Sequence, residues 1–476
     1  MITCSSEKKH DILVEFAGEH DCGSDKYGKT LQKIFKGEYL TQITYENKNG
    51  QMCVCVGIGK DTLTQNQILE VAAYAVSLMK EYKITEYDFD VSKFVTMSGL
   101  GVLEQVVHGI CLGNFEKYKS FHECIDSVSV NLTGITLEDE KQAEDFIKRG
   151  QTIGESVLFA RELVNAPSNL LKPMDMAKRI IEEFEVIGNP NVETELFVYG
   201  QLRTMGMHAL CSVGSSSVNP PCLLVIRYNA EDKNSEKIGM VGKGVTVDTG
   251  GYCLKPSSSM AGIKGDMAGA AAVAGAVYSL AKNNVKKNVT AVLPMCENRI
   301  SNGSLLPGDV ISSYSGKTIE VMNTDAEGRL ILADAVSYAV KDEGVTSVLD
   351  IATLTGAVVN MLGFSIAGVL SDSDLFYDRL ARAAIKSGEK YHRLPYGEEH
   401  EKMIESEVAD IKNMGESYCG TITAGLFIRR FAENVKWLHI DIAGTAWVDS
   451  PIWKYQKTGA TGAAASTLYY LCEEES

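Results

Sequence analysis

The sequence predicts an α/β protein of two domains, a smaller N-terminal α/β domain and a larger C-terminal catalytic domain with a mixed, largely parallel sheet flanked by helices. Three observations lead to this prediction. The chain has 476 residues, more than one ordinary domain, and 45% of them are hydrophobic, which is enough for sizeable cores. Short β-like runs alternate with helix-periodic stretches. A charged, helix-periodic stretch separates two such alternating regions.

The first region, residues 1–136, has the pattern of a small α/β domain. Short β-like runs alternate along the chain with stretches of helical pattern. The expected strands are Ile12–Phe16, Met52–Ile58 and Val128–Leu132, and the expected helices are Leu63–Tyr82 and Leu103–Cys111. No motif in this region carries evident chemistry.

Residues 137–165 are expected to form a linking helix, because their pattern is charged and helix-periodic up to the run NAPSN, where Pro167 stops it. The strand and helix alternation then resumes in residues 166–476, the expected catalytic domain. The expected strands are Cys222–Tyr228, Ile238–Val241, Val289–Leu293 and Val348–Ile351, and the expected helices are Gly269–Lys282 and Leu332–Lys341. Such alternation favours parallel strands covered by helices.

Composition excludes some classes of partner. The net charge of −16 and the pI near 5.1 argue against nucleic acid, which requires a basic surface. The N-terminus has no signal-peptide pattern, and the twelve cysteines are scattered without a CxxC pair, so we expect a cytoplasmic protein with reduced thiols. The uncharged run from Ile351 to Ser371 is interrupted by polar residues and glycines, which favours a buried segment over a membrane span.

Three segments, Val241–Ser258, Gly262–Ala272 and Asn323–Ala335, place charged residues among glycines at the ends of apolar runs. In an open α/β sheet such positions deliver side chains into a crevice. The charged residues are Lys243, Asp248, Lys255, Asp266, Asp325, Glu327 and Arg329. Each segment alone could hold an ordinary ion pair at a turn. If all converge, four carboxylates face three cations, and one or two divalent ions would relieve the repulsion.

These segments resemble the leucine aminopeptidases, also called cytosol aminopeptidases, whose signature NTDAEGRL is intact at Asn323–Leu330. Other blocks resemble the family in family order: ARELVNAPSN, VGKGVTVDTGG, KPS, DMAGAA, DIATLTGA, HIDIAGTAW and GATGAA, from Ala160 to Ala464. The resemblance to the N-terminal region is limited to size and α/β character.

The resemblance implies a set of metal ligands. Lys243, Asp248, Asp266 and Glu327 would hold an exchangeable metal ion, while Asp248, Asp325 and Glu327 would hold a second one. Zinc is the expected metal, and manganese, magnesium or cobalt would suit the exchangeable site. Lys243 would bind as a neutral amine, which a neighbouring dication permits by lowering its pKa.

The resemblance also implies roles beside the metals. The free α-amine of the substrate would bind the exchangeable metal and Asp266, and Lys255 would stabilise the oxyanion of the tetrahedral intermediate. Arg329 would hold a bicarbonate ion that accepts the proton of the attacking water. The implied substrate contacts are Ile263, Thr353, Leu354, Gly356 and Ala443.

Some residues depart from the family pattern. Val247 and Thr249 flank Asp248 where a Phe and a Ser are usual, and Ile263 replaces a pocket methionine. Ala446 also lies where a pocket side chain is expected. The β-branched Ile263 would stiffen this wall and alter the preference for the first residue, unless it is simply a core residue.

The implied function is a metal-dependent aminopeptidase that releases N-terminal leucine or other apolar residues from peptides by means of a water activated by two metals. The resemblance further implies a homohexamer. Two other readings stay open at this point. One is a binding or regulatory protein that keeps the fold, and the other is a dinuclear hydrolase for a different substrate such as a phosphate ester, which would not need an α-amine.

Overall fold

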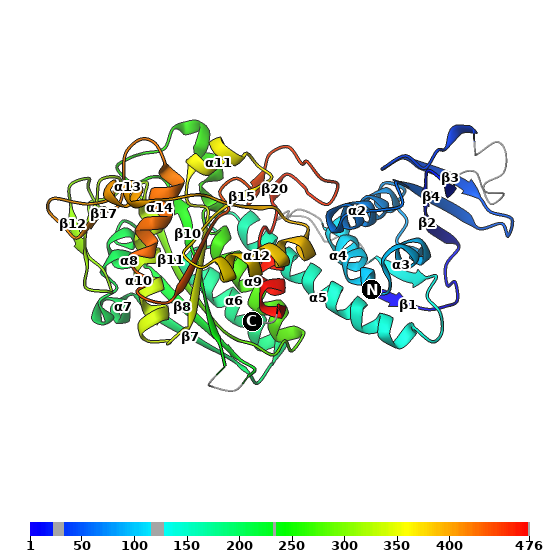
Figure 1. The fold of residues 1–476 in the computed structure, drawn as a ribbon, viewed down its shortest axis with the longest axis horizontal. Coiled ribbons are helices and arrows are strands. Elements are labelled where there is room, and N and C mark those ends of the chain that lie inside the picture. Colours follow the sequence, from blue (N-terminus) through cyan, green and yellow to red (C-terminus); the bar gives the residue numbers. More distant parts are fainter. Residues whose placement is uncertain (22–32, 116–127, 232–234, 475–476) are drawn as a thin grey trace. The chain divides into compact units, whose positions relative to one another are not determined.

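The computed structural model describes residues 1–21, 33–115, 128–231 and 235–474. The chain forms two compact units, each built around its own sheet (Figure 1). Unit 1 is Met1–Leu158 with Ser450–Lys457, and unit 2 is Phe159–Asp449 with Thr458–Ser476. The helix α5 (Glu140–Asn165) contributes residues to both units. The two-domain α/β fold class is confirmed, whereas the boundaries at 136 and 165 stay predictions.

Unit 1 contains a six-stranded sheet in the order β1-β6-β5-β2-β4-β3, parallel except for the edge pair β3/β4. Its strands are β1 (Ile2–Cys4), β2 (Ile12–Gly18), β3 (Gln42–Glu46), β4 (Met52–Gly59), β5 (Glu86–Asp90) and β6 (Ser129–Thr133). Its helices before α5 include α2 (Gln65–Glu81), α3 (Ser92–Ser98) and α4 (Val102–Asn114). These positions agree with the expected strands and helices of residues 1–136.

Helices α2 and α4 pack closely because of the sequence of each. Thr64 starts α2 with a capping box, in which its hydroxyl accepts from Gln67 N and the Gln67 side chain accepts from Thr64 N. On α4, a Cβ at Gly109 would lie 2.5 Å from Leu69 O, so only glycine allows this approach of the two backbones. The apolar faces of both helices then complete the core above β2, β4 and β5.

Unit 2 contains a nine-stranded mixed sheet in the order β16-β15-β18-β14-β9-β11-β8-β7, with β10 paired to β11. The central pairs β18/β14, β14/β9, β9/β11 and β11/β10 are all parallel. The strands are β7 (Val192–Val198), β8 (Cys222–Asn229), β9 (Lys237–Gly242), β10 (Gly244–Asp248), β11 (Asn288–Asn298), β14 (Ser347–Ala352), β15 (Ala367–Ser371), β16 (Tyr391–Arg393) and β18 (Lys436–Asp441). Parallel strands align their carboxyl ends at one edge, and the segment with Lys243 and Asp248 lies at the ends of β9 and β10.

Helices flank this sheet, and α9 and α10 both pack against β9, β11 and β14. The described helices of unit 2 after α5 are α6 (Pro173–Ile187), α7 (Tyr199–Met205), α8 (His208–Gly214), α9 (Ala268–Lys282), α10 (Glu327–Lys341), α11 (Gly356–Leu362), α12 (Asp374–Ser387), α13 (Glu398–Lys402), α14 (Gly420–Arg429) and α15 (Ala465–Glu473). A small sheet joins β12 (Val310–Ser312), β13 (Thr318–Glu320) and β17 (Ile411–Lys412), and β19 (Trp447–Val448) pairs with β20 (Gly459–Ala460).

Helix α10 begins at Glu327, five residues before the expected Leu332. This early start brings Glu327 and Arg329, two charges of the NTDAEGRL run, into the helix. Both belong to the first turn of α10. Gly328 has a low helix propensity and disfavours a helix at this position. The helix nevertheless starts here because its whole first turn is buried and is stabilised by packing.

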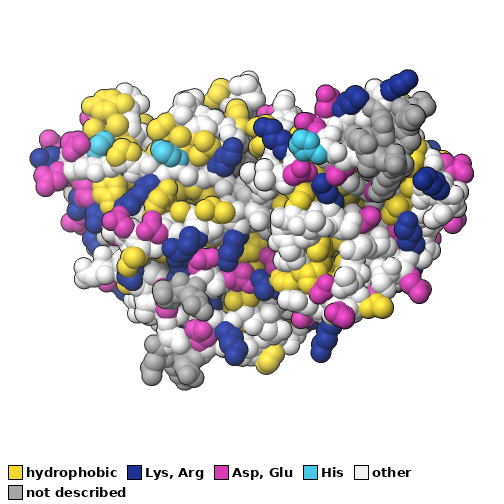
Figure 2. All heavy atoms as spheres, turned by 45° about the vertical axis from the view of Figure 1, so that its right-hand side comes forward, with side chains coloured by type: hydrophobic (Ala, Val, Ile, Leu, Met, Phe, Trp, Pro, Cys, Tyr) yellow, Lys and Arg dark blue, Asp and Glu magenta, His cyan; other side chains and the backbone are white. Residues whose placement is uncertain are grey.

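The uncharged run Ile351–Ser371 is not one helix but the end of β14, then α11, then β15. No helix in the described parts of the chain is long and apolar enough to cross a membrane. Ten cysteines, all those within the described ranges, are free thiols. On the face drawn in Figure 2, lysine and arginine side chains lie interspersed with acidic ones.

Candidate metal centre

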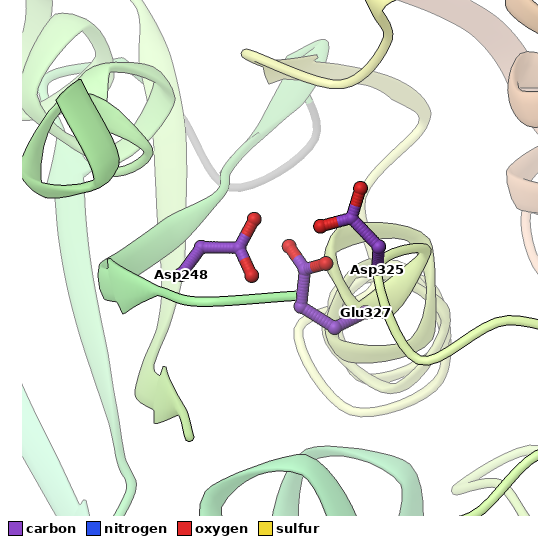
Figure 3. A group of neighbouring side chains, drawn as sticks. All are labelled: Asp248, Asp325 and Glu327. Carbon is purple, nitrogen blue, oxygen red and sulfur yellow. The ribbon is translucent and has the colours of Figure 1, made fainter. Parts of the chain in front are cut away.

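Three carboxylates of unit 2 lie together at the carboxyl end of its sheet. Asp248 ends β10, Asp325 lies in the loop before α10, and Glu327 begins α10. Oxygen atoms of the three side chains lie within 4.8 Å of one another, and the side chains point to a common centre (Figure 3). Asp248 and Glu327 are buried, and Asp325 is partly exposed. Three carboxylates at this spacing form a site that could hold a metal ion.

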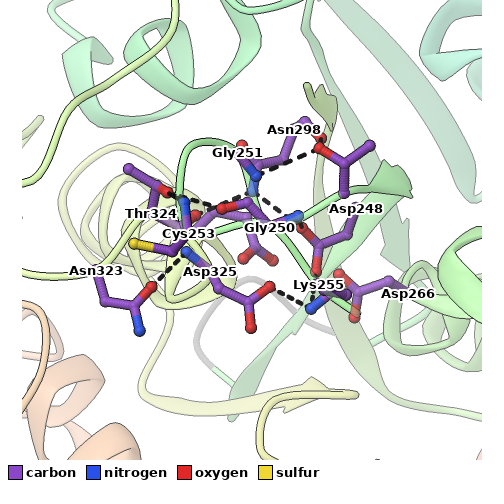
Figure 4. Close-up of polar contacts among 12 residues, drawn as sticks. Asp248, Gly250, Gly251, Cys253, Lys255, Asp266, Asn298, Asn323, Thr324 and Asp325 are labelled. Carbon is purple, nitrogen blue, oxygen red and sulfur yellow. Dashed lines mark hydrogen bonds and ion pairs between the residues drawn. The ribbon is translucent and has the colours of Figure 1, made fainter. Parts of the chain in front are cut away.

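Two lysines lie among these carboxylates. Lys243 Nζ is 2.7 Å from Asp266 Oδ1 and 2.9 Å from Glu327 Oε1. Lys255 Nζ is 2.8 Å from Asp248 Oδ2 and also pairs with Asp325 Oδ1 (Figure 4). The four acids and two of the three cations expected from the sequence therefore form one cluster.

The backbone around the cluster is shaped by glycines at two close approaches. A Cβ at Gly328 would lie 2.3 Å from Lys243 Cε, so a side chain there would displace Lys243 from the acids. Gly250 has φ +86°, and a Cβ there would lie 2.5 Å from Cys253 O. This left-handed turn allows Gly250 N to donate to Asp248 Oδ1 at 2.9 Å. The glycines of the signature segments thus serve the geometry of charged side chains.

Electrostatics disfavours four ionised acids in this place. Burial raises the pKa of Glu327 well above its usual value, and the charge of Asp248 raises it further. Burial raises the pKa of Asp266 to about 6, although Lys243 opposes the shift. Burial would lower the pKa of Lys243, but the surrounding carboxylates outweigh it and hold the pKa above its usual value. The cluster therefore has more negative charge than its lysines neutralise.

The hydrogen-bonding state of the buried carboxylate oxygens independently indicates that the cluster can hold a divalent cation. Oε2 of Glu327 and Oδ2 of Asp266 are buried without a hydrogen-bond partner, and Oε1 of Glu327 has only its ion pair with Lys243. An unpaired buried carboxylate oxygen is costly, and a cation would satisfy it. Oxygen donors with one amine suit zinc, manganese, magnesium or cobalt.

Arg329, the third cation expected from the sequence, contacts the backbone of Asn413. Its Nη1 donates to the backbone oxygen of Asn413 at 2.8 Å, and its Nε is buried without a hydrogen-bond partner. Burial lowers the pKa of Arg329 to about 10, while Glu327 and Asp441 oppose the shift. The guanidinium is therefore charged at neutral pH, and it retains an unused donor that could face an anion.

A cavity of about 340 Å³ opens beside the cluster. All the residues expected to contact substrate line it, and so do most of the charged ones. The lining residues are Lys243, Asp248, Lys255, Ser259, Gly262, Ile263, Gly265, Asp266, Asp325, Thr353, Leu354, Thr355, Gly356, Ala443, Ala446 and Trp447. Ile263 is half-buried and faces this cavity, so it is not a core residue.

The loop after β14 connects the cavity with the cluster. The Thr353 hydroxyl donates to Asp266 Oδ1 at 2.8 Å, and the Thr353 backbone oxygen accepts from Lys243 Nζ at 3.1 Å. Asp441, at the end of β18, accepts from the Thr355 hydroxyl at 2.6 Å and from Leu354 N at 3.1 Å. The cavity wall and the charged cluster are thereby held by one hydrogen-bond network.

Sequence reasoning missed residues that hold the charged side chains. Asn298 Nδ2 donates to Asp248 Oδ1 at 2.9 Å and to Thr324 O at 3.0 Å. The Thr324 hydroxyl donates to Gly250 O and accepts from Cys253 N, which joins the two metal-site loops (Figure 4). Thr324 directly precedes Asp325 in the NTDAEGRL run and Asn298 ends β11 outside the motifs, and nothing in their spacing predicts these partners. Trp447, a wall of the cavity, was missed for the same reason.

A model of the cytosol aminopeptidase family, catalytic domain, matches residues 158–469. The chain belongs to this family. Its similarity to the probable cytosol aminopeptidase of Clostridium perfringens is 41% identity over 452 residues, which cover 92% of this chain and 90% of that one. Its similarity to the probable cytosol aminopeptidase of Treponema denticola is 37% identity over 451 residues, 93% of each chain.

Solved structures agree with this assignment. A mutant of tomato leucine aminopeptidase superposes with a TM-score of 0.88 at 30% identity, covering 99% of this chain and 96% of that one. The bottromycin maturation enzyme BotP in complex with Mn also superposes with a TM-score of 0.88, at 29% identity and with 97% and 99% coverage. The family resemblance drawn from NTDAEGRL is confirmed, and membership of the family supports a metal-dependent aminopeptidase activity.

Proposed function

We propose that this cytosol aminopeptidase hydrolyses the first peptide bond of peptides with a free N-terminus, with a preference for leucine or other apolar residues, at a centre of two divalent ions. The observation that carries the proposal is the cluster of Asp248, Asp325 and Glu327 beside the cavity, with the buried Glu327 oxygens lacking hydrogen-bond partners. Lys243 and Asp266 complete the proposed ligand set, with Lys243 as a neutral amine when a metal is bound.

Two bound divalent ions would supply Lewis acidity, which lowers the pKa of a water molecule and polarises the scissile carbonyl. Zinc is the proposed metal, and manganese, magnesium or cobalt could occupy the exchangeable site. Asp266 would bind the free α-amine of the substrate, since Oδ2 of this carboxylate has no hydrogen-bond partner. This contact would explain selection for peptides with an unblocked N-terminus.

The remaining residues act on charge and position. Lys255 lines the cavity and would stabilise the oxyanion that develops on the carbonyl oxygen. Arg329, which cannot act as a base, would hold a bicarbonate ion near its free Nε, and this anion would accept the water proton. Ile263, Thr353, Leu354, Gly356 and Ala443 would contact the first residue of the peptide.

We further propose a cytoplasmic homohexamer, by likeness to the family and to relatives called cytosol aminopeptidases. Partners other than peptides, such as nucleic acid, are not expected from the acidic composition. Sedimentation of the purified protein at micromolar concentration tests the oligomer. A stable monomer that is fully active would overturn this part of the proposal.

The experiment for the activity is leucine release from a chromogenic leucine anilide by metal-stripped protein, with and without Zn²⁺ or Mn²⁺. N-Acetyl-leucine anilide and a phosphate monoester serve as controls. We expect metal-restored cleavage of the free-amine substrate alone. Cleavage of the phosphate ester instead would favour another dinuclear hydrolase. Metal binding without cleavage of anilides with any of several first residues would favour a binding protein.

A further inference from the structure

The segment Met322–Ala326, which carries Asp325 into the cluster and leads directly into Glu327, forms no helix or strand. Its polar backbone groups therefore need other partners. Asn323 Oδ1 accepts from Asp325 N at 2.7 Å within the segment. Most of the other bonds come from one buried side chain outside it, that of Asn413.

Asn413 uses both ends of its amide on this segment. Its Oδ1 accepts from Met322 N at 2.7 Å and from Asn323 N at 3.3 Å. Its Nδ2 donates to Asn323 O at 2.8 Å and to Ala326 O at 3.3 Å. The side chain is fully buried, so water cannot replace these bonds without entering the structure. Only an amide offers two acceptor and two donor sites in this geometry.

The backbone of Asn413 reaches the other side of the site. Its oxygen accepts the Arg329 Nη1 bond at 2.8 Å, and its N donates to Glu320 O at 3.0 Å. Asn413 directly follows β17, which pairs in parallel with β13. The small sheet thus holds the backbone of Asn413, and the side chain of Asn413 in turn holds the segment Met322–Ala326.

We propose that Asn413 is a positioning residue of the metal centre, whose amide sets the place of Asp325 and Glu327 and whose backbone oxygen sets the direction of Arg329. This inference rests on the proposed function. Asp325 in this segment and Glu327 at the start of α10 must keep their spacing against their mutual repulsion, and four hydrogen bonds from a buried amide hold the segment that joins them. Without them the segment can relax so that its acids separate.

A purely structural role for Asn413 is the rival explanation, and unit 1 offers a matched control. Asn131 is equally buried and also bridges chain segments, since its Nδ2 donates to Asp88 Oδ1 at 2.9 Å and to Glu7 O at 3.2 Å. Its side-chain hydrogen bonds to Thr3, Glu7 and Asp88 all lie within unit 1, while the metal centre lies in unit 2. Asn131→Ala therefore removes a comparable buried amide without disturbing Asp325 or Glu327.

The test compares Asn413→Ala and Asn131→Ala with the unaltered full-length protein. Competition with a chromogenic chelator measures the Co²⁺ affinity, and the visible absorption spectrum reports the coordination geometry of the bound Co²⁺. Denaturant unfolding measures the stability of the metal-free protein. We expect Asn413→Ala to weaken Co²⁺ binding about 10- to 100-fold, as losses of groups around metal ligands do, and to change the spectrum. Leucine anilide turnover should show a lower kcat with little change in KM. Asn131→Ala should lose stability only.

Co²⁺ affinity and spectrum equal to those of the unaltered protein, with a stability loss like that of Asn131→Ala, would overturn the inference. If Asn413→Ala is not recovered folded, Asn413→Ser is used instead, and Co²⁺ binding at least about tenfold weaker is again expected, since a serine hydroxyl has one donor where the amide has two and is too short to make all four bonds. Failure of the unaltered protein to bind Co²⁺ or to cleave the anilide would instead count against the proposed function itself.

Discussion

Each unit of this protein contains the same pair of buried residues in the same register. In unit 1, Asp88 on β5 faces Asn131 on the parallel strand β6, and in unit 2, Asp248 on β10 faces Asn298 on the parallel strand β11. In both pairs the asparagine Nδ2 donates to the aspartate Oδ1 at 2.9 Å. The two pairs differ only in what surrounds them.

The surroundings decide what each pair can do. Lys9 N and His10 N donate to the Asp88 oxygens, so this carboxylate has backbone donors close by. Asp248 instead shares its space with Asp325 and Glu327, and the Glu327 oxygens lack hydrogen-bond partners. A buried aspartate thus has a structural role when donors from the surrounding fold satisfy its carboxylate oxygens. It becomes a candidate ligand when neighbouring acids leave charge unbalanced.

Glu327→Gln should show the largest effect, because it removes the charge of a buried carboxylate from the centre. We expect leucine anilide cleavage to fall to background. Since burial raises the pKa of Glu327, a neutral amide should leave the metal-free protein at least as stable at neutral pH. Mn²⁺ at about 100 times its Kd should add about 2.7 kcal/mol to the unfolding free energy of the original protein only. Substantial activity in Glu327→Gln would contradict the proposed ligand set.

Asp88→Asn tests the other half of the comparison. The new amide group must face either Asn131 Nδ2 or the backbone N–H groups of Lys9 and His10, so donors meet donors. We expect unit 1 to lose roughly 1–3 kcal/mol of unfolding free energy. Activity per folded molecule with added Mn²⁺ should be unchanged. Denaturant unfolding and active-site titration measure the two quantities, and a loss of metal binding would break the distinction between the units.

Asp334 on α10 extends the comparison to pH. It accepts from Leu210 N at 2.9 Å and from Tyr314 N at 2.7 Å, and burial raises its pKa to about 7. The unfolded chain would lose this proton near pH 4, so between about pH 4 and 7 the folded state binds more protons. Stability contributed by Asp334 therefore falls as pH rises through this window, by at most about 1.4 kcal/mol per pH unit.

The measurement for Asp334 is the unfolding free energy of the protein and of Asp334→Asn at several values between pH 5 and 8. We expect the difference between the two proteins to shift in favour of Asp334→Asn as the pH rises. Asp88→Asn provides the control, because its effect should not follow the same curve. Parallel profiles for Asp334→Asn and the original protein would contradict the raised pKa.

Ile263→Val should show the smallest effect, since it removes one methylene from a cavity wall and leaves the carboxylates intact. One methylene corresponds to roughly 0.8 kcal/mol. We expect the ratio of kcat/KM for phenylalanine anilide to that for leucine anilide to rise a few-fold, because the wall recedes. Co²⁺ affinity should stay constant. An unchanged ratio would remove Ile263 from the residues that select the first amino acid.

Local patterns predicted most strands and helices, and their success has a simple cause. Runs such as Met52–Ile58 and Val348–Ile351 are apolar because most of their residues are buried within the sheets. Burial requires apolar residues whichever strands and helices pack against the run. The early start of α10 could not be predicted, because Gly328 is a poor helix former and only the packing of the first turn offsets it. The same packing places Gly328 against Lys243.

The residues of the candidate centre were predicted as types and as a group, while their supports were not. Chemistry limits which residues can bind metals or stabilise charge, so Asp325 and Glu327 could be found from the NTDAEGRL signature and Asp248 from the run VGKGVTVDTGG. A supporting amide has no such chemical mark. Asn413 contacts a segment about 90 residues earlier in the chain. Asparagine occurs in turns, at surfaces and in cores, so the residue type alone does not indicate such a contact.

The sequence by itself therefore determined the α/β class, the family and the charged residues available for catalysis, because these follow from periodicity and residue chemistry. Only the tertiary structure decided that Asp248 and Asp88, two aspartates in equivalent strand pairs, have different neighbours. It also decided that the Glu327 oxygens stay without hydrogen-bond partners and that Asn413 holds the segment beside them. The physical reason is that electrostatic balance depends on distances across the fold, which no local pattern encodes.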